Sequence, residues 1–187
     1  AEWNEAKVNG KNISFTDEYW VDPCFRKAKI KIEKGLNTVE VKGIYTEKIN
    51  LEAIYILGDF GVFDGIIKEK PAKISFGDLT KQGFQLYGGK ITYIFNQKVT
   101  EKSTLSLSSM GNASAIKVNG KFIGWKPYKV ILEPSDKIEI ELSLTRRNTF
   151  GPLHRLPLTK GGGPDGFITS GERWSDNFVT MECGLEK

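Results

Sequence analysis

A short hairpin sequence occurs twice in this chain and constrains its fold more than any other feature. Residues 7–13 read Lys-Val-Asn-Gly-Lys-Asn-Ile, and residues 117–123 read Lys-Val-Asn-Gly-Lys-Phe-Ile. Asn-Gly between β-forming residues favours a type I′ turn, because both central residues of that turn need a positive φ. Each copy therefore predicts a two-residue hairpin with its apolar side chains on one face: Ala6, Val8 and Ile13 in the first, and Ile116, Val118 and Ile123 in the second.

The two hairpins are followed by the same order of elements. An aromatic loop comes next, at residues 19–23 in the first copy and 124–128 in the second, and then a turn and a strand of alternating pattern. Shared order over several elements indicates an internal repeat. Two further strand patterns precede the second hairpin, and only a few residues precede the first. We therefore expect a truncated first unit, in a piece of a longer polypeptide or as extra strands on the second unit.

Strand patterns dominate the rest of the chain. Residues 137–144 alternate strictly, which predicts a strand with one buried face formed by Ile138, Ile140, Leu142 and Leu144. Similar patterns cover residues 38–45, with Val39 and Val41 inward, and residues 91–99 and 104–110, whereas 51–57 is mostly apolar and predicts a strand buried on both sides. No window has the apolar spacing of an amphipathic helix. The sequence predicts an all-β sandwich or barrel, divided into residues 1–68 and 69–187.

Composition argues against several classes of protein. The net charge of +4 is spread along the chain without a basic block, so we expect no nucleic-acid partner. No apolar run is long enough to span a membrane. Residues 1–5 lack the features of a signal peptide, and the compartment stays open. Two distant cysteines and a single histidine predict neither a disulfide framework nor a multi-histidine metal site.

Several of these segments together resemble a known kind of module. The pattern comprises Val-Asn-Gly-Lys, Gly-Trp-x-Pro-Tyr at residues 124–128, the strand Ile-Glu-Ile-Glu-Leu, and Arg-Asn-x-x-Gly-Pro-x-His at residues 147–154. It resembles the galactose-binding-like jelly-roll modules found near the C-terminus of large bacterial glycoside-hydrolase-like proteins. The resemblance implies an accessory β-sandwich that binds carbohydrate or supports a catalytic domain located elsewhere in the parent protein. It therefore names carbohydrate, or that catalytic domain, as the partner.

Candidate carbohydrate-binding residues lie in three segments. Aromatic rings stack against sugar faces, and planar polar side chains bind hydroxyl groups. The candidates are Trp125, Tyr128, Arg147, Asn148, His154, Trp174 and Asp176. For five of them there is a structural alternative: Trp125 and Tyr128 close the end of the core, the arginine pairs with a carboxylate, the asparagine caps a turn, and the histidine forms a hydrogen bond within a loop.

Catalysis within the chain is the other functional alternative. Glu172 and Asp176 flank Trp174, and glycosidases use two carboxyl groups across the scissile bond. No nucleophile motif, P-loop or dinucleotide fingerprint is present. We therefore expect no catalytic residue and no cofactor, although a structural calcium ion at Asp59 and a role in protein interaction stay open. The glycine-rich residues 160–166 predict a loop.

Overall fold

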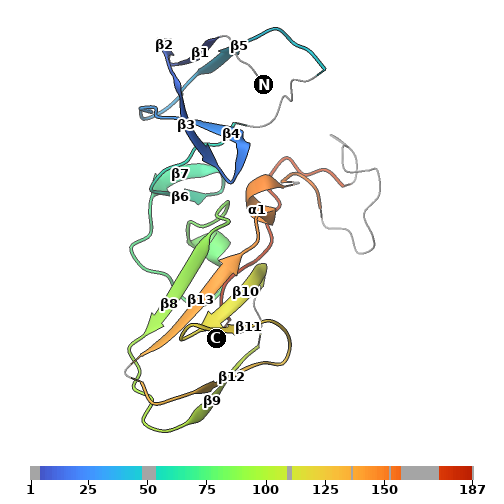
Figure 1. Ribbon diagram of the computed structural model, residues 1–187. Helices are drawn as coiled ribbons and strands as arrows, with labels where there is room; N and C mark the ends of the chain where they lie inside the picture. The colour runs from blue at the N-terminus through green and yellow to red at the C-terminus, as the bar shows by residue number, and fades with distance from the viewer. Residues whose placement is uncertain are drawn as a thin grey trace. The chain divides into compact units, whose positions relative to one another are not determined.

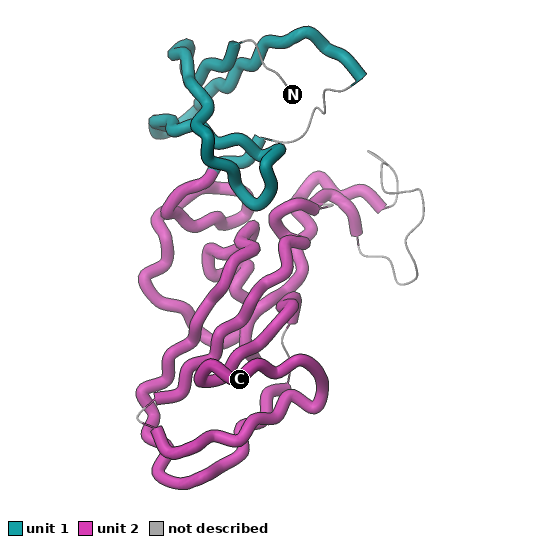
Figure 2. Tube along the Cα trace, in the orientation of Figure 1, with its two compact units in different colours: residues 1–56 teal, residues 57–187 magenta. Residues whose placement is uncertain are grey.

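The computed structural model describes residues 5–47, 54–108, 111–135, 137–151, 153–156 and 173–186. This part of the chain is nearly all β and forms several antiparallel sheets, as the sequence predicted (Figure 1). Its contacts divide the chain into unit 1, residues 1–56, and unit 2, residues 57–187 (Figure 2). Residues 57–68, which we assigned to the first domain, lie in unit 2. No helix in the described segments is long and apolar enough to cross a membrane.

Unit 2 is built around a four-stranded antiparallel sheet in the order β11-β10-β13-β8. Its strands are β8 (Lys90–Phe95), β10 (Ala113–Val118), β11 (Lys121–Ile123) and β13 (Ile138–Leu144). The four apolar positions predicted for β13 are all buried, and the polar positions between them are partly exposed. The period-two pattern thus correctly identified both the strand and its buried face.

A second pair of strands contributes to the same core. Strand β9 (Ser103–Leu107) pairs with β12 (Tyr128–Leu132), and Leu132 is buried with the residues of the four-stranded sheet. The partly buried side chains packed against this core include Leu105, Leu107, Tyr128 and Val130. The two-stranded β9–β12 ribbon and the four-stranded sheet therefore share one hydrophobic core, which is the arrangement of a β-sandwich.

The remaining elements of unit 2 are short. Strands β6 (Phe60–Phe63) and β7 (Ile66–Glu69) form a hairpin, and the only helical segments described are η1 (Leu79–Gln82) and α1 (Arg147–Phe150). Each helical segment is about one turn long. The expectation that the chain lacks amphipathic helices agrees with the described residues.

Unit 1 holds a three-stranded sheet and a hairpin. The sheet has the order β2-β1-β5, from β1 (Glu5–Val8), β2 (Lys11–Asn12) and β5 (Val39–Lys42). The hairpin joins β3 (Phe15–Trp20) and β4 (Asp22–Ala28). A cluster of three rings, Trp20, Phe25 and Tyr55, has centroid distances between 5.4 and 6.0 Å.

The internal repeat is a repeat of structure. Asn9 and Gly10, like Asn119 and Gly120, all have positive φ, and the cross-strand pairs are those of the predicted two-residue hairpin. Each turn asparagine also holds the third strand of its sheet. The amide N–H of Asn119 donates to the carbonyl of Glu139, whose N–H donates to the Asn119 Oδ1 at 2.7 Å; Asn9 makes the same two bonds to Thr38. Strand β5 is therefore the counterpart of β13.

Two predictions for unit 1 need correction. Val39 and Val41 lie opposite Val8 and Ala6 on the apolar face, as expected, but they remain 39% and 38% exposed because β5 is an edge strand among the described residues. The predicted strand 51–57 is wrong for the part that is described: residues 54–57 are not a strand, and Ile54 is 64% exposed. Residues 51–53 lie outside the described segments. A mostly apolar run is buried only when another layer of the structure covers it.

Candidate functional site

The most exposed tryptophan of the described residues lies in the aromatic loop after the second hairpin. This loop joins β11 to β12, and its Lys126–Pro127 peptide bond is cis. Trp125 is 81% exposed. Its ring therefore does not close the end of the core, which was the structural alternative for this residue, and it presents an apolar surface to solvent.

A shallow groove of about 380 Å³ is lined in part by the three residues that follow Trp125 in the loop. It is lined by Lys126, Pro127 and Tyr128 together with Ser106, Leu107 and Ser108. The antiparallel register of β9 and β12 brings these two segments together, because Tyr128 pairs with Leu107 and Lys129 pairs with Ser106. The groove is built by strand pairing that the sequence alone did not identify.

The groove combines apolar rings with polar groups. Ser106 and Ser108 carry hydroxyl groups that donate and accept hydrogen bonds, and Lys126 adds three donors. The Lys126 Nζ lies 6.0 Å from the centroid of the Tyr128 ring, while this tyrosine also packs against the core. A tyrosine ring together with hydroxyl and ammonium groups suits a polar ligand that also has an apolar face.

A second group of predicted residues lies elsewhere in unit 2. The ring of His154 stacks on Trp174 with centroids 4.8 Å apart, and the Trp174 Nε1 donates to the Asp176 Oδ1 at 3.0 Å. The His154 Nδ1 is 2.9 Å from the carbonyl oxygen of Ser175. The structure therefore brings three of the seven candidates together. None of the three lines the groove, and Figure 1 shows α1, which precedes His154 along the chain, and the β9–β12 pair at opposite ends of the four-stranded sheet.

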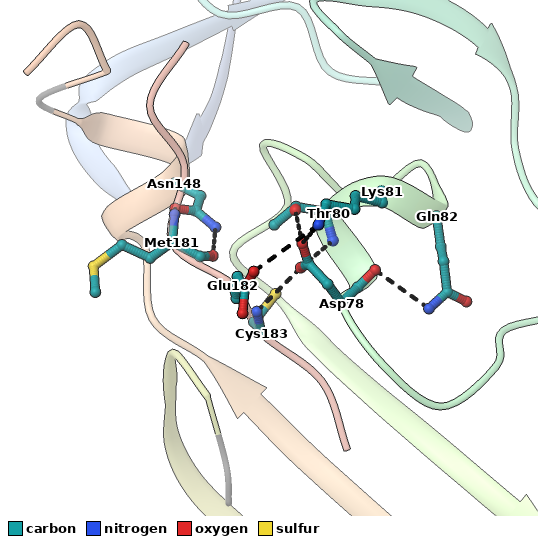
Figure 3. Close-up of polar contacts among 8 residues, drawn as sticks. All are labelled: Asp78, Thr80, Lys81, Gln82, Asn148, Met181, Glu182 and Cys183. Carbon is teal, nitrogen blue, oxygen red and sulfur yellow. Dashed lines mark hydrogen bonds and ion pairs between the residues drawn. The ribbon is translucent and has the colours of Figure 1, made fainter. Parts of the chain in front are cut away.

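Of the two candidates from α1, Asn148 has a structural role. Asn148 is 1% exposed; its Nδ2 donates to the carbonyl of Met181, and its Oδ1 accepts from the N–H of Met181, each at 2.8 Å. Both the amide nitrogen and the amide oxygen of Asn148 thus bond to the backbone of the C-terminal segment, and we call this pair of hydrogen bonds the Asn148 clip (Figure 3). Burial lowers the pKa of the neighbouring Arg147, which remains charged at neutral pH.

Of the two carboxylates considered for catalysis, the structure describes only Asp176. Glu172 and the glycine-rich residues 160–166 lie outside the described segments, and Asp176 accepts the bond from Trp174. Asp59, considered for calcium, pairs with Lys70 at 2.5 Å. In the described ranges, no three His, Cys, Asp or Glu side chains are grouped to hold a metal ion.

An anchoring point that the sequence analysis missed is Asp78. Its Oδ1 accepts from the N–H of Thr80 at 3.0 Å, as the N-cap of η1, and from the N–H of Cys183 at 3.3 Å (Figure 3). The N–H of Leu79 donates in turn to the carbonyl of Cys183 at 2.7 Å. An aspartate before a helical turn is a capping signal, but its bond to a residue more than a hundred positions away has no local signature. Asp78 attaches the C-terminal segment to the core.

The two cysteines should differ sharply in reactivity. Cys24 is exposed and Cys183 is buried, and burial, with the nearby Asp78, raises the pKa of the Cys183 thiol to about 11. The thiolate is the reactive form. In a thiol-exchange assay near pH 8 we expect one thiol per native chain to react promptly and the second only after denaturation. Prompt reaction of two native thiols, or of the one remaining in a Cys24→Ser variant, would contradict this placement.

The same thiol links stability to alkaline pH. The unfolded thiol has the lower pKa, near 9, so the unfolded state loses its proton first and stability falls as pH rises from about 9 to 11. The slope from this group is at most about 1.4 kcal/mol per pH unit. A Cys183→Ala variant should lose stability less steeply over that range in denaturant titrations.

Comparison with known proteins adds no relative: no protein family matches this chain, and neither does any curated protein or solved structure.

Proposed function

We propose that this chain is a non-catalytic β-sandwich module that binds carbohydrate at the groove beside Trp125. The observation that carries the proposal is the 81% exposure of Trp125, which directly precedes along the chain the groove residues Lys126, Pro127 and Tyr128. Exposed tryptophan is costly to leave in water and is common at recognition sites. A pyranose ring has an apolar face for the indole and hydroxyl groups for Ser106, Ser108 and Lys126.

The resemblance to galactose-binding-like jelly-roll modules supports the same class of ligand. In this proposal the module is an accessory part of a glycoside-hydrolase-like protein, whose catalytic residues lie on another domain. The groove is shallow and open, which suits binding along the surface of a glycan chain more than enclosing a single small sugar. The binding residues are Trp125, Tyr128, Lys126, Ser106 and Ser108.

A glycan array followed by calorimetry tests the proposal. Trp125→Ala should weaken binding of the selected glycan at least about tenfold, while Trp125→Phe should retain part of it, because aromatic surface supplies the contact. Phe122→Ala is the matched control, since Phe122 is also an exposed aromatic residue but lies in strand β11, before the loop that carries Trp125. All three variants should keep the stability of the parent chain to within about 0.5 kcal/mol.

Two results would overturn the proposal. One is the absence of binding to any plant, animal or microbial glycan on the array. The other is binding that Trp125→Ala leaves unchanged while a Trp174→Ala variant loses it, which would move the site to the group of His154, Trp174 and Asp176.

A further inference from the structure

The outer edge of β5 in unit 1 carries a row of backbone groups that no described residue pairs with. The N–H of Asn9 donates to the carbonyl of Thr38, so the backbone N–H and C=O groups of Thr38 point toward β1. Along a strand, the N–H and C=O groups of successive residues point alternately to one side and to the other. Glu40 and Lys42 are therefore also directed toward β1, and the N–H and C=O groups of Val39, Val41 and Gly43 are directed to the outer edge.

The counterpart strand in unit 2 shows what such an edge accepts. Strand β13 pairs with β10 on one side and, on the other, with β8 over six residue pairs. The N–H of Leu144 donates to the carbonyl of Gly89 on that outer side, and Leu144 corresponds to Gly43 in the repeat. An antiparallel strand thus occupies, in unit 2, the side that is open in the described part of unit 1.

We infer that the outer edge of β5 pairs with β5 of a second copy of this chain, in an antiparallel arrangement about a two-fold axis at Val41. Open, regular edge strands are templates for this kind of pairing. A two-fold axis at Val41 places Val41 opposite its symmetry mate and Val39 opposite Gly43, so that the outward-directed groups of the two strands bond to each other. The two apolar faces formed by Ala6, Val8, Val39 and Val41 then continue into one another.

The charges of Glu40 and Lys42 favour this register over the two registers with the axis one residue away. With the axis at Val41, Glu40 lies opposite Lys42 of the second copy, and this pair occurs twice. Moving the axis to Glu40 or to Lys42 keeps the backbone bonds in phase, but it places two glutamates or two lysines directly opposite each other. Like charges in that position destabilise a strand pair, and opposite charges stabilise it.

Disulfide trapping tests the register. In a Cys24→Ser background, Val41→Cys should form a disulfide-linked dimer under mild oxidation, because Cα atoms of directly opposed, hydrogen-bonded residues are about 5.5 Å apart. Val39→Cys is the matched control, since it has similar exposure on the same strand. Its symmetry mate is about 13 Å away along the strand, so we expect at least tenfold less dimer. Equal trapping of both, trapping of Val39→Cys alone, or none from either variant overturns the inference.

A mixing experiment tests the charge pairing without a disulfide. Glu40→Lys chains place lysines against each other and Lys42→Glu chains place glutamates against each other, so each alone should have a dimer dissociation constant at least tenfold above that of the parent in sedimentation equilibrium. An equal mixture should recover parent-like association, because every facing pair is then of opposite charge. A parent chain that stays monomeric at millimolar concentration, or a mixture no tighter than its components, overturns the inference and leaves the edge open or paired with a different polypeptide.

Discussion

Replacing Ile116 by alanine should lower the free energy of unfolding of unit 2 by about 2–5 kcal/mol. Ile116 lies in β10, is 0% exposed, and belongs to the core shared by the four-stranded sheet and the β9–β12 ribbon. Its removal leaves a cavity between strands that are fixed on both sides, because β10 pairs with β11 and with β13. Such a site cannot collapse easily, and the loss should approach the upper part of the range. Urea denaturation measures it.

Ile94→Ala is the matched control for that experiment. Ile94 lies on β8 of the same sheet and is 58% exposed, so the identical substitution removes little buried surface. We expect a loss below about 1 kcal/mol, mostly from the lower strand preference of alanine. Similar losses from Ile94→Ala and Ile116→Ala would show that the sheet does not bury the face described here.

Replacing Asn148 by alanine should cost about 2 kcal/mol of stability. The variant removes both hydrogen bonds to the backbone of Met181 and leaves that donor and acceptor without their partner at a site that is 1% exposed. Glycan binding by the folded variant should remain, because Asn148 lies apart from the groove. Thermal or urea unfolding measures the first expectation, and calorimetry the second.

Asn177→Ala is the control for Asn148. Asn177 is exposed and lies three residues after Trp174 in the chain. We therefore expect its replacement to change the free energy of unfolding by less than about 0.5 kcal/mol. If Asn148→Ala abolished glycan binding at full stability, Asn148 would be a ligand contact after all, and the separation of the clip from the groove would be wrong.

Local sequence signals predicted the local structure well. Asn-Gly at 9–10 and 119–120 determined both hairpins and their registers, because the turn requires two residues with positive φ. The alternation of apolar and polar residues in β13 identified its buried face, because successive side chains of a strand point to opposite faces of the sheet. These features depend on residues within a few positions of each other.

Features that depend on distant contacts were harder to predict. The residues at 54–57 are as apolar as a buried strand but lie outside any strand. Ser106 and Ser108 became candidates only through the register of β9 against β12, which brings them beside the 126–128 segment. Asp78 and Asn148 were missed as anchors because each bonds to the C-terminal segment. Pairing between distant segments leaves no periodic pattern in either segment.

The candidate site was therefore predicted in part. Trp125 and Tyr128 were identified from the aromatic loop, and the structure adds Lys126, Pro127 and the β9 residues around the groove. His154, Trp174 and Asp176 form a separate group held by internal stacking and hydrogen bonds. The sequence could not show that the seven candidates belong to different places.

The most direct test of the carbohydrate-binding proposal is a nuclear magnetic resonance titration of the isotope-labelled chain with the glycan selected on the array. We expect shifts of the Trp125 indole N–H and of the amides of Ser106, Ser108, Lys126 and Tyr128, with the Trp174 indole N–H unmoved. Shifts confined to Trp174 and the residues around His154, or no shifts at any glycan concentration, would contradict it.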